Sequence, residues 1–217
     1  MRYFTILTSI QLLCGTGVAA PPFELWTFDN TTTIGGHKVT VVGHPRVIDT
    51  PMGKAVEFNG KDDALFLDLH PLAGAETFTW EVIFRPDADG SPEQRFFHLQ
   101  ENGTDNRLLF EIRLTDGRWC LDSFAKSGAA SRALMDRKLL HAAGAWYHAA
   151  MVYDGREFRN YVNGVQQVAA QVQLSPQGPG QSSAGVRINK VDYFKGAIRV
   201  SRMTRGALTP AEFMKLR

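Results

Sequence analysis

The chain has 217 residues, of which 24 are Lys or Arg and 22 are Asp or Glu, so its formal net charge is only +2. This near-neutral charge excludes the strongly basic surface with which proteins bind nucleic-acid phosphates. With 44% hydrophobic and 21% charged residues, the composition is that of a globular protein, and 20 Gly, 10 Pro and 14 Phe favour short strands joined by tight turns.

The N-terminus has the pattern of a secretory signal peptide. Arg2 precedes an apolar run at residues 3–13, and small residues follow up to Ala20. The apolar run is too short to span a bilayer. We therefore expect a secreted or periplasmic protein in which residues 1–20 are a signal peptide, residues 21–217 form one domain, and no stable membrane span exists.

The two cysteines are far apart. Cys14 lies in the expected signal peptide, so its removal leaves Cys120 alone, with neither a disulfide partner nor the ligands of a thiolate zinc site. Residues 12–15 (Leu-Leu-Cys-Gly) faintly resemble a lipoprotein box, which makes lipidation at Cys14 an alternative to simple cleavage. Cys120, between Trp119 and Leu121, is most simply a small buried residue.

Strand patterns separated by turn signals follow along the mature chain. They predict strands at residues 24–28, 38–42, 55–58, 64–69, 78–84, 95–100, 107–114, 118–124, 146–153, 158–162, 165–172, 186–189 and 196–203. Asp116-Gly117 and Asn163-Gly164 each predict a tight hairpin. Strands of this number, without crossover helices, pair antiparallel and close as two packed sheets.

The remaining segments complete this all-β picture. Residues 175–183 are rich in Pro, Gly and Ser and are expected to form a loop. Thr209, Pro210 and Glu212 predict a short C-terminal helix that begins with a capping box. The sequence therefore predicts a single-domain, antiparallel, two-sheet jelly-roll sandwich with a short C-terminal helix.

Several short motifs occur in a characteristic order along almost the whole mature chain. They lie at residues 25–29 (LWTFD), 53–60 (GKAVEFNG), 62–63 (DD), 78–86 (FTWEVIFRP), 146–155 (WYHAAMVYDG), 161–164 (YVNG), 194–198 (FKGAI) and 207–209 (ALT). Together they resemble the laminin-G-like and pentraxin-like branch of the concanavalin A-like lectin/glucanase superfamily. The resemblance implies a jelly roll with a concave and a convex sheet that binds carbohydrate or an extracellular protein, often near calcium.

Calcium is the one cofactor that the resemblance implies, with Asp29, Asp62 and Asp63 as candidate metal ligands. Calcium needs several hard oxygen ligands at once. The alternative is that Asp29 ends a strand and that the other two acids lie in a polar turn. Arg199 stands where the family often has an acid, and it would repel a cation or pair with Asp29.

Polar side chains alternate along several central strands and form the candidate ligand-binding surface. Its residues are Glu81, His98, Gln100, Glu111, Arg113 and Asp122, joined by Tyr193 as an exposed ring. Alternation places each set on one side of its own strand, but the sequence leaves open which sets share a sheet face. The alternative is that these groups, Glu81 and His148 in particular, make structural hydrogen bonds.

The leading hypothesis is an exported, non-catalytic module that binds a glycan or a cell-surface partner. The superfamily's hydrolase pattern of two Glu and one Asp on one strand face does not occur in the sequence. The alternative is a polysaccharide lyase or glycoside hydrolase that uses His98, Glu111, Arg113 and His148, and it requires these side chains to converge in an open groove. A third interpretation is an adhesion protein that binds no small ligand.

Overall fold

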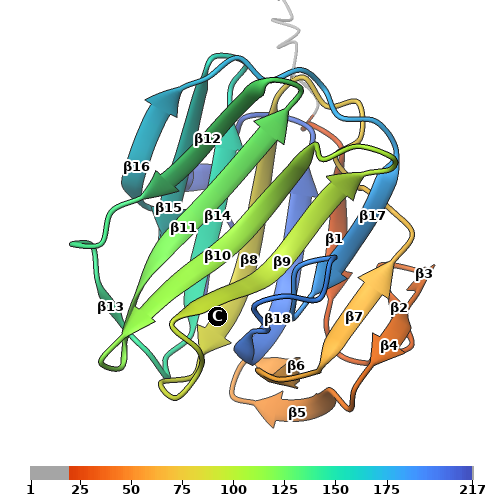
Figure 1. Ribbon diagram of the computed structural model, residues 1–217, viewed down its shortest axis with the longest axis vertical. Coiled ribbons are helices and arrows are strands. Elements are labelled where there is room, and N and C mark those ends of the chain that lie inside the picture. The colour runs from red at the N-terminus through yellow and green to blue at the C-terminus, as the bar shows by residue number, and fades with distance from the viewer. Residues whose placement is uncertain (1–19, 217) are drawn as a thin grey trace, which may run out of the picture.

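The computed structural model describes residues 20–216 and consists mainly of two packed antiparallel sheets (Figure 1). Sheet I has the order β16 (Val165–Gln171), β15 (Glu157–Val162), β14 (Tyr147–Tyr153), β8 (Phe78–Pro86), β18 (Lys195–Thr204), β6 (Gly53–Asn59) and β5 (Arg46–Thr50), and β1 (Phe23–Thr27) also pairs with β18. Sheet II has the order β12 (Ala130–Met135), β11 (Arg118–Ser127), β10 (Arg107–Thr115), β9 (Glu93–Glu101), β17 (Gly180–Ala184), β7 (Ala64–Leu67) and β4 (Thr40–Val42), with β13 (His141–Ala142) beside β11. A small hairpin joins β2 (Thr33–Ile34) to β3 (His37–Lys38).

The predicted fold class is confirmed, and the alternation along β8 shows how the sandwich forms. Phe78, Trp80, Val82 and Phe84 belong to the core between the sheets, while Thr79, Glu81 and Ile83 face the other side of the strand and are buried as well. Trp80 lies 4.7 Å from Phe110 of sheet II, and Phe84 stacks on Phe96 at 4.3 Å, both measured between ring centroids. Each such aromatic side chain contributes about 1.5–3 kcal/mol by leaving water.

Both predicted hairpin turns are present, and their backbone angles explain the residues used. Asp116 and Gly117 have φ of 50° and 69°, and Asn163 and Gly164 have φ of 50° and 78°. Two consecutive residues with positive φ form the turn that matches the twist of a two-stranded ribbon, and Asp, Asn and Gly adopt it at the lowest cost. The turns set the registers of β10 against β11 and of β15 against β16.

Two local predictions were wrong. Residues 186–189 are not a strand but part of the connection between β17 and β18. Residues 180–183 of the expected loop at 175–183 belong instead to strand β17 (Gly180–Ala184), between β9 and β7. The glycine explains the second error, because a Cβ at Gly180 would lie 1.9 Å from the Gln100 carbonyl oxygen. The small residues of this segment serve a close strand approach rather than a turn.

The C-terminal segment crosses the outer face of sheet I. Its helix is a single 3₁₀ turn at Pro210–Glu212, opened by the predicted capping box, in which the Thr209 amide donates to the Glu212 carboxylate at 2.8 Å. Phe213 then packs against His148 and Tyr161. This segment therefore closes over strands β8, β14 and β15.

Two sequence predictions concern membranes and export. The part of the chain that the structure describes holds no helix of the length and apolarity that a bilayer span requires. Residues 1–19 of the expected signal peptide, including Cys14, lie outside the described residues.

Candidate functional site

The structure brings five of the candidate ligand-binding residues onto one surface, the outer face of sheet II. His98 and Gln100 lie on β9, Glu111 and Arg113 on β10, and Asp122 on β11. Glu111 pairs across the ladder with Asp122. Their neighbours Phe97, Leu99, Ile112 and Leu121 all point into the core, so the candidate residues face away from it.

Three of these side chains, Glu111, Arg113 and Asp122, form an ion network with three neighbours, Glu93, Arg95 and Asp192. Arg113 Nη2 lies 2.7 Å from Asp122 and 3.2 Å from Glu111, Arg95 Nε lies 3.0 Å from Glu111, and both arginines also contact Glu93. Arg95 reaches Asp192 of the β17–β18 connection as well. Burial, together with the repulsion between the two acids, raises the pKa of Glu111, and burial raises that of Asp122. The network occupies the groups that a ligand would need.

His98 is enclosed rather than poised for catalysis. Its side chain is fully buried, and its Nδ1 accepts a hydrogen bond from the Ile188 amide at 3.0 Å. Burial and the nearby Arg187 and Arg107 charges lower its pKa to about 2. The imidazole is therefore neutral at ordinary pH.

Glu81 and His148 lie on the other sheet. Both are buried on the outer side of sheet I. The Glu81 carboxylate accepts three hydrogen bonds there: from His148 Nε2 at 2.9 Å, from Arg202 Nε at 2.6 Å and from the Met214 amide at 2.7 Å. Since His98 and His148 belong to opposite sheets, the four residues of the enzyme alternative do not converge in one groove.

The two remaining ligand candidates are partly exposed. Gln100 donates its amide to the Thr104 carbonyl, which fixes the hairpin between β9 and β10. Tyr193 lies in the β17–β18 connection beside the buried Phe194, and its ring is half-buried. Cys120 is buried as expected, but the register places it opposite Arg113, on the outer side of sheet II.

The three candidate metal ligands are engaged in local hydrogen bonds. Asp63 accepts from the His44 and Asn59 amides, Asp62 from the Asn59 side chain, and Asp29 from the Asn30 side chain. Within residues 20–216 no group of three or more His, Cys, Asp or Glu side chains is arranged to hold a metal ion. These three carboxylates therefore do not form a donor set that fits calcium.

Arg199 also has a partner of its own. It lines a groove of about 630 Å³ together with Asp29, but its Nε donates to the Met52 carbonyl while Asp29 bonds to Asn30. The same groove exposes Phe23 and Leu25 on the outer side of β1. Arg199 thus holds the β5–β6 hairpin rather than a strand-end carboxylate.

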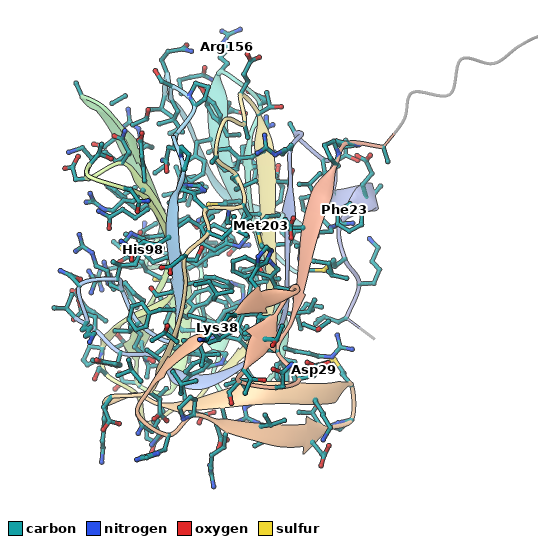
Figure 2. The ribbon with its side chains drawn as sticks, turned by 90° about the vertical axis from the view of Figure 1, so that its right-hand side faces the viewer. Phe23, Asp29, Lys38, His98, Arg156 and Met203 are labelled. Atoms are coloured by element: carbon teal, nitrogen blue, oxygen red, sulfur yellow. The ribbon has the colours of Figure 1, made fainter. Side chains whose placement is uncertain are left out.

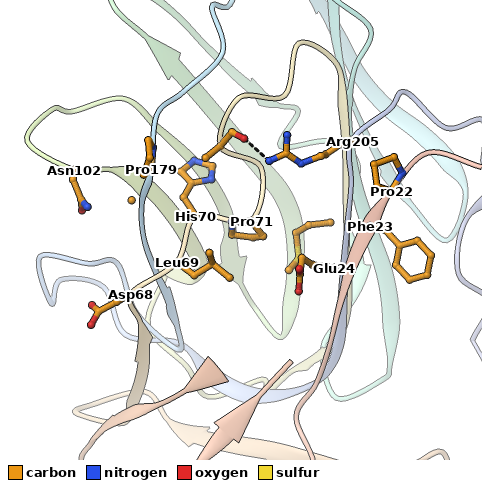
Figure 3. A pocket seen from close by; sticks show the side chains of 13 residues that line it. Pro22, Phe23, Glu24, Asp68, Leu69, His70, Pro71, Asn102, Pro179 and Arg205 are labelled. Atoms are coloured by element: carbon orange, nitrogen blue, oxygen red, sulfur yellow. Dashed lines mark hydrogen bonds between the residues drawn. The ribbon is translucent and has the colours of Figure 1, made fainter. Parts of the chain in front are cut away.

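A second cavity lies at the open edge of the sandwich, between β1 of sheet I and β7 and β17 of sheet II (Figure 3). This edge cleft has a volume of about 460 Å³. Figure 2 looks onto this edge and shows Met203 between the two layers. The residues that line the cleft are Pro22, Phe23, Glu24, Asp68, Leu69, His70, Pro71, Ala73, Asn102, Pro179, Gly180, Met203 and Arg205.

The edge cleft is lined by both exposed polar side chains and apolar side chains. Asp68 and Asn102 are exposed, and Glu24 is partly exposed, with only His37 near its carboxylate at 3.7 Å. Leu69, Pro71 and Met203 supply apolar surface. Arg205 donates to the Ala73 carbonyl (Figure 3), and the His70 ring is hydrogen-bonded to the Gln177 side chain at 2.8 Å.

Sequence reasoning missed this cleft. Glu24, Asp68, Asn102 and Arg205 come from four distant segments, each at or beyond a strand end. The motifs of the sequence gave no signal for their association, because it results from the way in which the two sheets close.

A family model of the laminin-G type, described as concanavalin A-like lectin/glucanases superfamily, matches residues 59–213. The chain therefore belongs to this superfamily, as its motifs indicated. No curated protein matches the chain significantly.

Solved structures share the fold at low identity. Domain 4 of AbnA, an extracellular GH43 arabinanase from Geobacillus stearothermophilus in complex with arabinotriose, is 21% identical with a TM-score of 0.64, covering 89% of this chain and 97% of that one. The binding domain of Paraclostridial Mosquitocidal Protein 1 is 15% identical with a TM-score of 0.61, covering 88% of this chain and 50% of that one. The binding domain of botulinum neurotoxin DC in complex with SialylT is 12% identical with a TM-score of 0.62, covering 88% of this chain and 49% of that one. The chain thus spans about half of these two toxin domains.

Proposed function

We propose that this protein is an exported, non-catalytic carbohydrate-binding module that holds a neutral sugar in the edge cleft. The observation that carries the proposal is the cleft itself, in which Asp68, Asn102 and Glu24 offer hydrogen-bonding groups beside apolar wall. Sugar hydroxyls need donors and acceptors together, and the C–H face of the ring needs apolar contact. A carboxylate accepts from two hydroxyls, while an amide both donates and accepts.

Two further observations support this proposal. The charges of Arg95, Arg113, Glu111 and Asp122 pair with one another and are nearly buried, whereas Asp68 and Asn102 of the edge cleft are exposed to a ligand. Two of the structures with the same fold were solved in complex with a saccharide or with SialylT. Export rests on the expected signal peptide at residues 1–20 and agrees with the extracellular arabinanase among these structures.

A glycan array followed by titration calorimetry tests the proposal. The binding glycan is titrated into the protein, the double variant Asp68→Ala/Asn102→Ala, and the control Asp49→Ala, whose carboxylate is 88% exposed on the edge strand β5. We expect the double variant to lose at least about tenfold in affinity, as the removal of two hydrogen-bonding groups implies, and the control to bind normally.

The outcomes separate the alternatives. Full affinity in the double variant would place the glycan elsewhere, and silence across the array at high protein concentration would overturn carbohydrate binding in favour of an extracellular protein partner. Release of unsaturated or reducing sugar from a bound polysaccharide would overturn the non-catalytic assignment.

A further inference from the structure

One end of the outer face of sheet II carries cations that the ion network leaves out. Arg107 begins β10, Arg187 lies in the β17–β18 connection, and Lys126 stands opposite Arg107 on β11. The network described above lies further along the same strands, around Glu111 and Asp122. We call the group of Arg107, Arg187 and Lys126 the basic end.

The connection that carries Arg187 is held firmly against β9. The Gly185 amide donates to the Phe96 carbonyl at 2.9 Å, the Ile188 amide to His98 Nδ1 at 3.0 Å, and the Arg95 amide to the Asp192 carbonyl at 2.9 Å. A tight turn from Arg187 to Lys190 adds a fourth hydrogen bond. Arg187 therefore starts from a backbone whose position over sheet II is fixed, as a preorganised binding group requires.

Two donors at this end have no acceptor in the described part of the chain. His98 Nδ1 accepts from Ile188, so the neutral ring carries its proton on Nε2, which is buried without a hydrogen-bond partner. Arg107 Nε is likewise buried and unpaired, although its Nη1 donates to the Asp105 carbonyl at 2.7 Å. Buried donors are normally satisfied, so these two mark a place that favours an oxygen acceptor.

One carboxylate, Asp105, balances only part of the charge of the three cations at the basic end. The ion pairs among residues 20–216 do not include Arg187, while Lys126 contacts Asp105, which also lies 3.8 Å from Arg107. The next acid, Glu111, is already shared by Arg95 and Arg113. The backbone places the two arginines near each other, since Arg187 precedes Ile188, which bonds to His98, and Arg107 is two residues from Leu109, the ladder partner of His98. Burial and the Arg187 charge both lower the pKa of Arg107. An anion placed here relieves the repulsion between like charges.

We propose that the basic end binds the oxyanion of an acidic sugar, either a uronate carboxylate or a sulfate ester, between Arg187 and Arg107. Guanidinium groups form paired hydrogen bonds with planar carboxylates and with sulfate oxygens. The cation–π contact of Arg107 with Phe124, at 4.7 Å, holds its guanidinium over the face of the sheet. His98 contributes as a neutral donor beneath the site.

NMR titration at constant ionic strength tests this site. Sodium glucuronate, sodium sulfate and glucose are added separately to the protein, to Arg187→Ala and to Arg132→Ala, an exposed arginine of β12 that serves as the control. We expect glucuronate or sulfate, but not glucose, to shift the Ile188 amide and the Arg107 Nε–H signals. Arg187→Ala should weaken binding about tenfold, the loss expected for one charged hydrogen-bonding group, and Arg132→Ala should not.

Comparing the two anions also identifies the kind of acidic sugar, and a variant of the edge cleft separates the two sites. Stronger binding of glucuronate indicates a uronic acid, and stronger binding of sulfate indicates a sulfated sugar. Asp68→Ala/Asn102→Ala should leave the titration unchanged, so that failure at one site does not imply failure at the other. Equal shifts in Arg187→Ala and Arg132→Ala, or no shift at tens of millimolar anion, would overturn the proposal.

Discussion

The buried acidic side chains on the outer faces of the two sheets have pKa values shifted in opposite directions. On sheet I, burial alone would raise the pKa of Glu81, but hydrogen bonds from His148, Arg202 and the Met214 amide outweigh it, and the pKa is lowered. On sheet II, burial raises the pKa of Glu111 and Asp122 although two arginines lie beside them. The charged form is thus favoured on one face and disfavoured on the other.

The C-terminal segment accounts for this difference. It lies across sheet I and brings the Met214 amide to Glu81, while the Glu212 carbonyl fixes the Arg202 guanidinium. On sheet II, Glu111 and Asp122 are also nearly buried, but in the described part of the chain their charged partners are arginines that each contact several acids. We infer that the sheet I cluster is structural and that, on the sheet II face, burial opposes the charged form of the carboxylates.

The largest expected effect is the loss of the Glu81 carboxylate. Glu81→Ala leaves His148, Arg202 and the Met214 amide without their shared acceptor, so the free energy of unfolding should fall by about 3–5 kcal/mol. Urea denaturation followed by fluorescence measures it, with the exposed Glu76→Ala as a control that should stay within about 0.5 kcal/mol. A loss below about 1 kcal/mol for Glu81→Ala would show that the cluster is not structural.

The next largest effect is a fall in the free energy of unfolding at acidic pH that is due to His98. The pKa of His98 in the folded protein, about 2, lies below the ordinary histidine value of 6.5, so the unfolded chain binds the proton more readily. The stabilisation is therefore complete above pH 6.5 and is lost as the pH falls. Between pH 6.5 and 4.5 it declines by about 2.5 kcal/mol, because each pH unit corresponds to about 1.4 kcal/mol.

The variant His98→Gln isolates this contribution. Its amide oxygen can still accept from the Ile188 amide, and it does not titrate, so urea denaturation at pH 7 and 4.5 should show a decline smaller by about 2.5 kcal/mol than in the parent protein. The other buried groups cancel in this difference. His70, whose pKa burial also lowers, and Glu111, whose raised pKa acts in the opposite direction, are present in both proteins. Identical declines would contradict the assignment.

A smaller effect should follow the loss of Asp122, the sheet II counterpart of Glu81. Asp122→Ala removes a contact of 2.7 Å with Arg113, but Arg113 keeps Glu111 and Glu93, and the repulsion between Asp122 and Glu111 disappears. The net change in the free energy of unfolding should be about 1 kcal/mol or less. If urea denaturation shows a loss equal to that of Glu81→Ala, the contrast between the two faces fails.

The fold was predictable because it depends on local signals that repeat. The alternation around Trp80 and Glu81, the Asp116-Gly117 and Asn163-Gly164 turns, and the ordered motifs led directly to an antiparallel sandwich of the correct family. Strand β17 was not predictable, because Gly180 and the serines after it form a strand only through their neighbours β9 and β7.

The candidate site was predictable only in part. Alternation placed Glu111 and Arg113 on one side of their strand. It could not show that Asp122 joins them or that His98 and His148 belong to opposite sheets, because the order of strands in a sheet is not a local property. The same reason hides the edge cleft, whose Glu24, Asp68 and Asn102 meet only after both sheets have closed.

The smallest expected effect concerns the reactivity of Cys120, which tests whether solvent reaches the outer face of sheet II beneath the ion network. The thiol is 2% exposed beside Arg113, and burial raises its pKa, so the thiolate that reacts with disulfide reagents is scarce and shielded. We expect negligible labelling of this thiol by an aromatic disulfide in the native protein at pH 7.5, and complete labelling in guanidinium chloride, with Cys120→Ser to assign the signal. Rapid native labelling would mean that solvent reaches beneath the ion network, and the acids of sheet II would then be exposed rather than held at a cost.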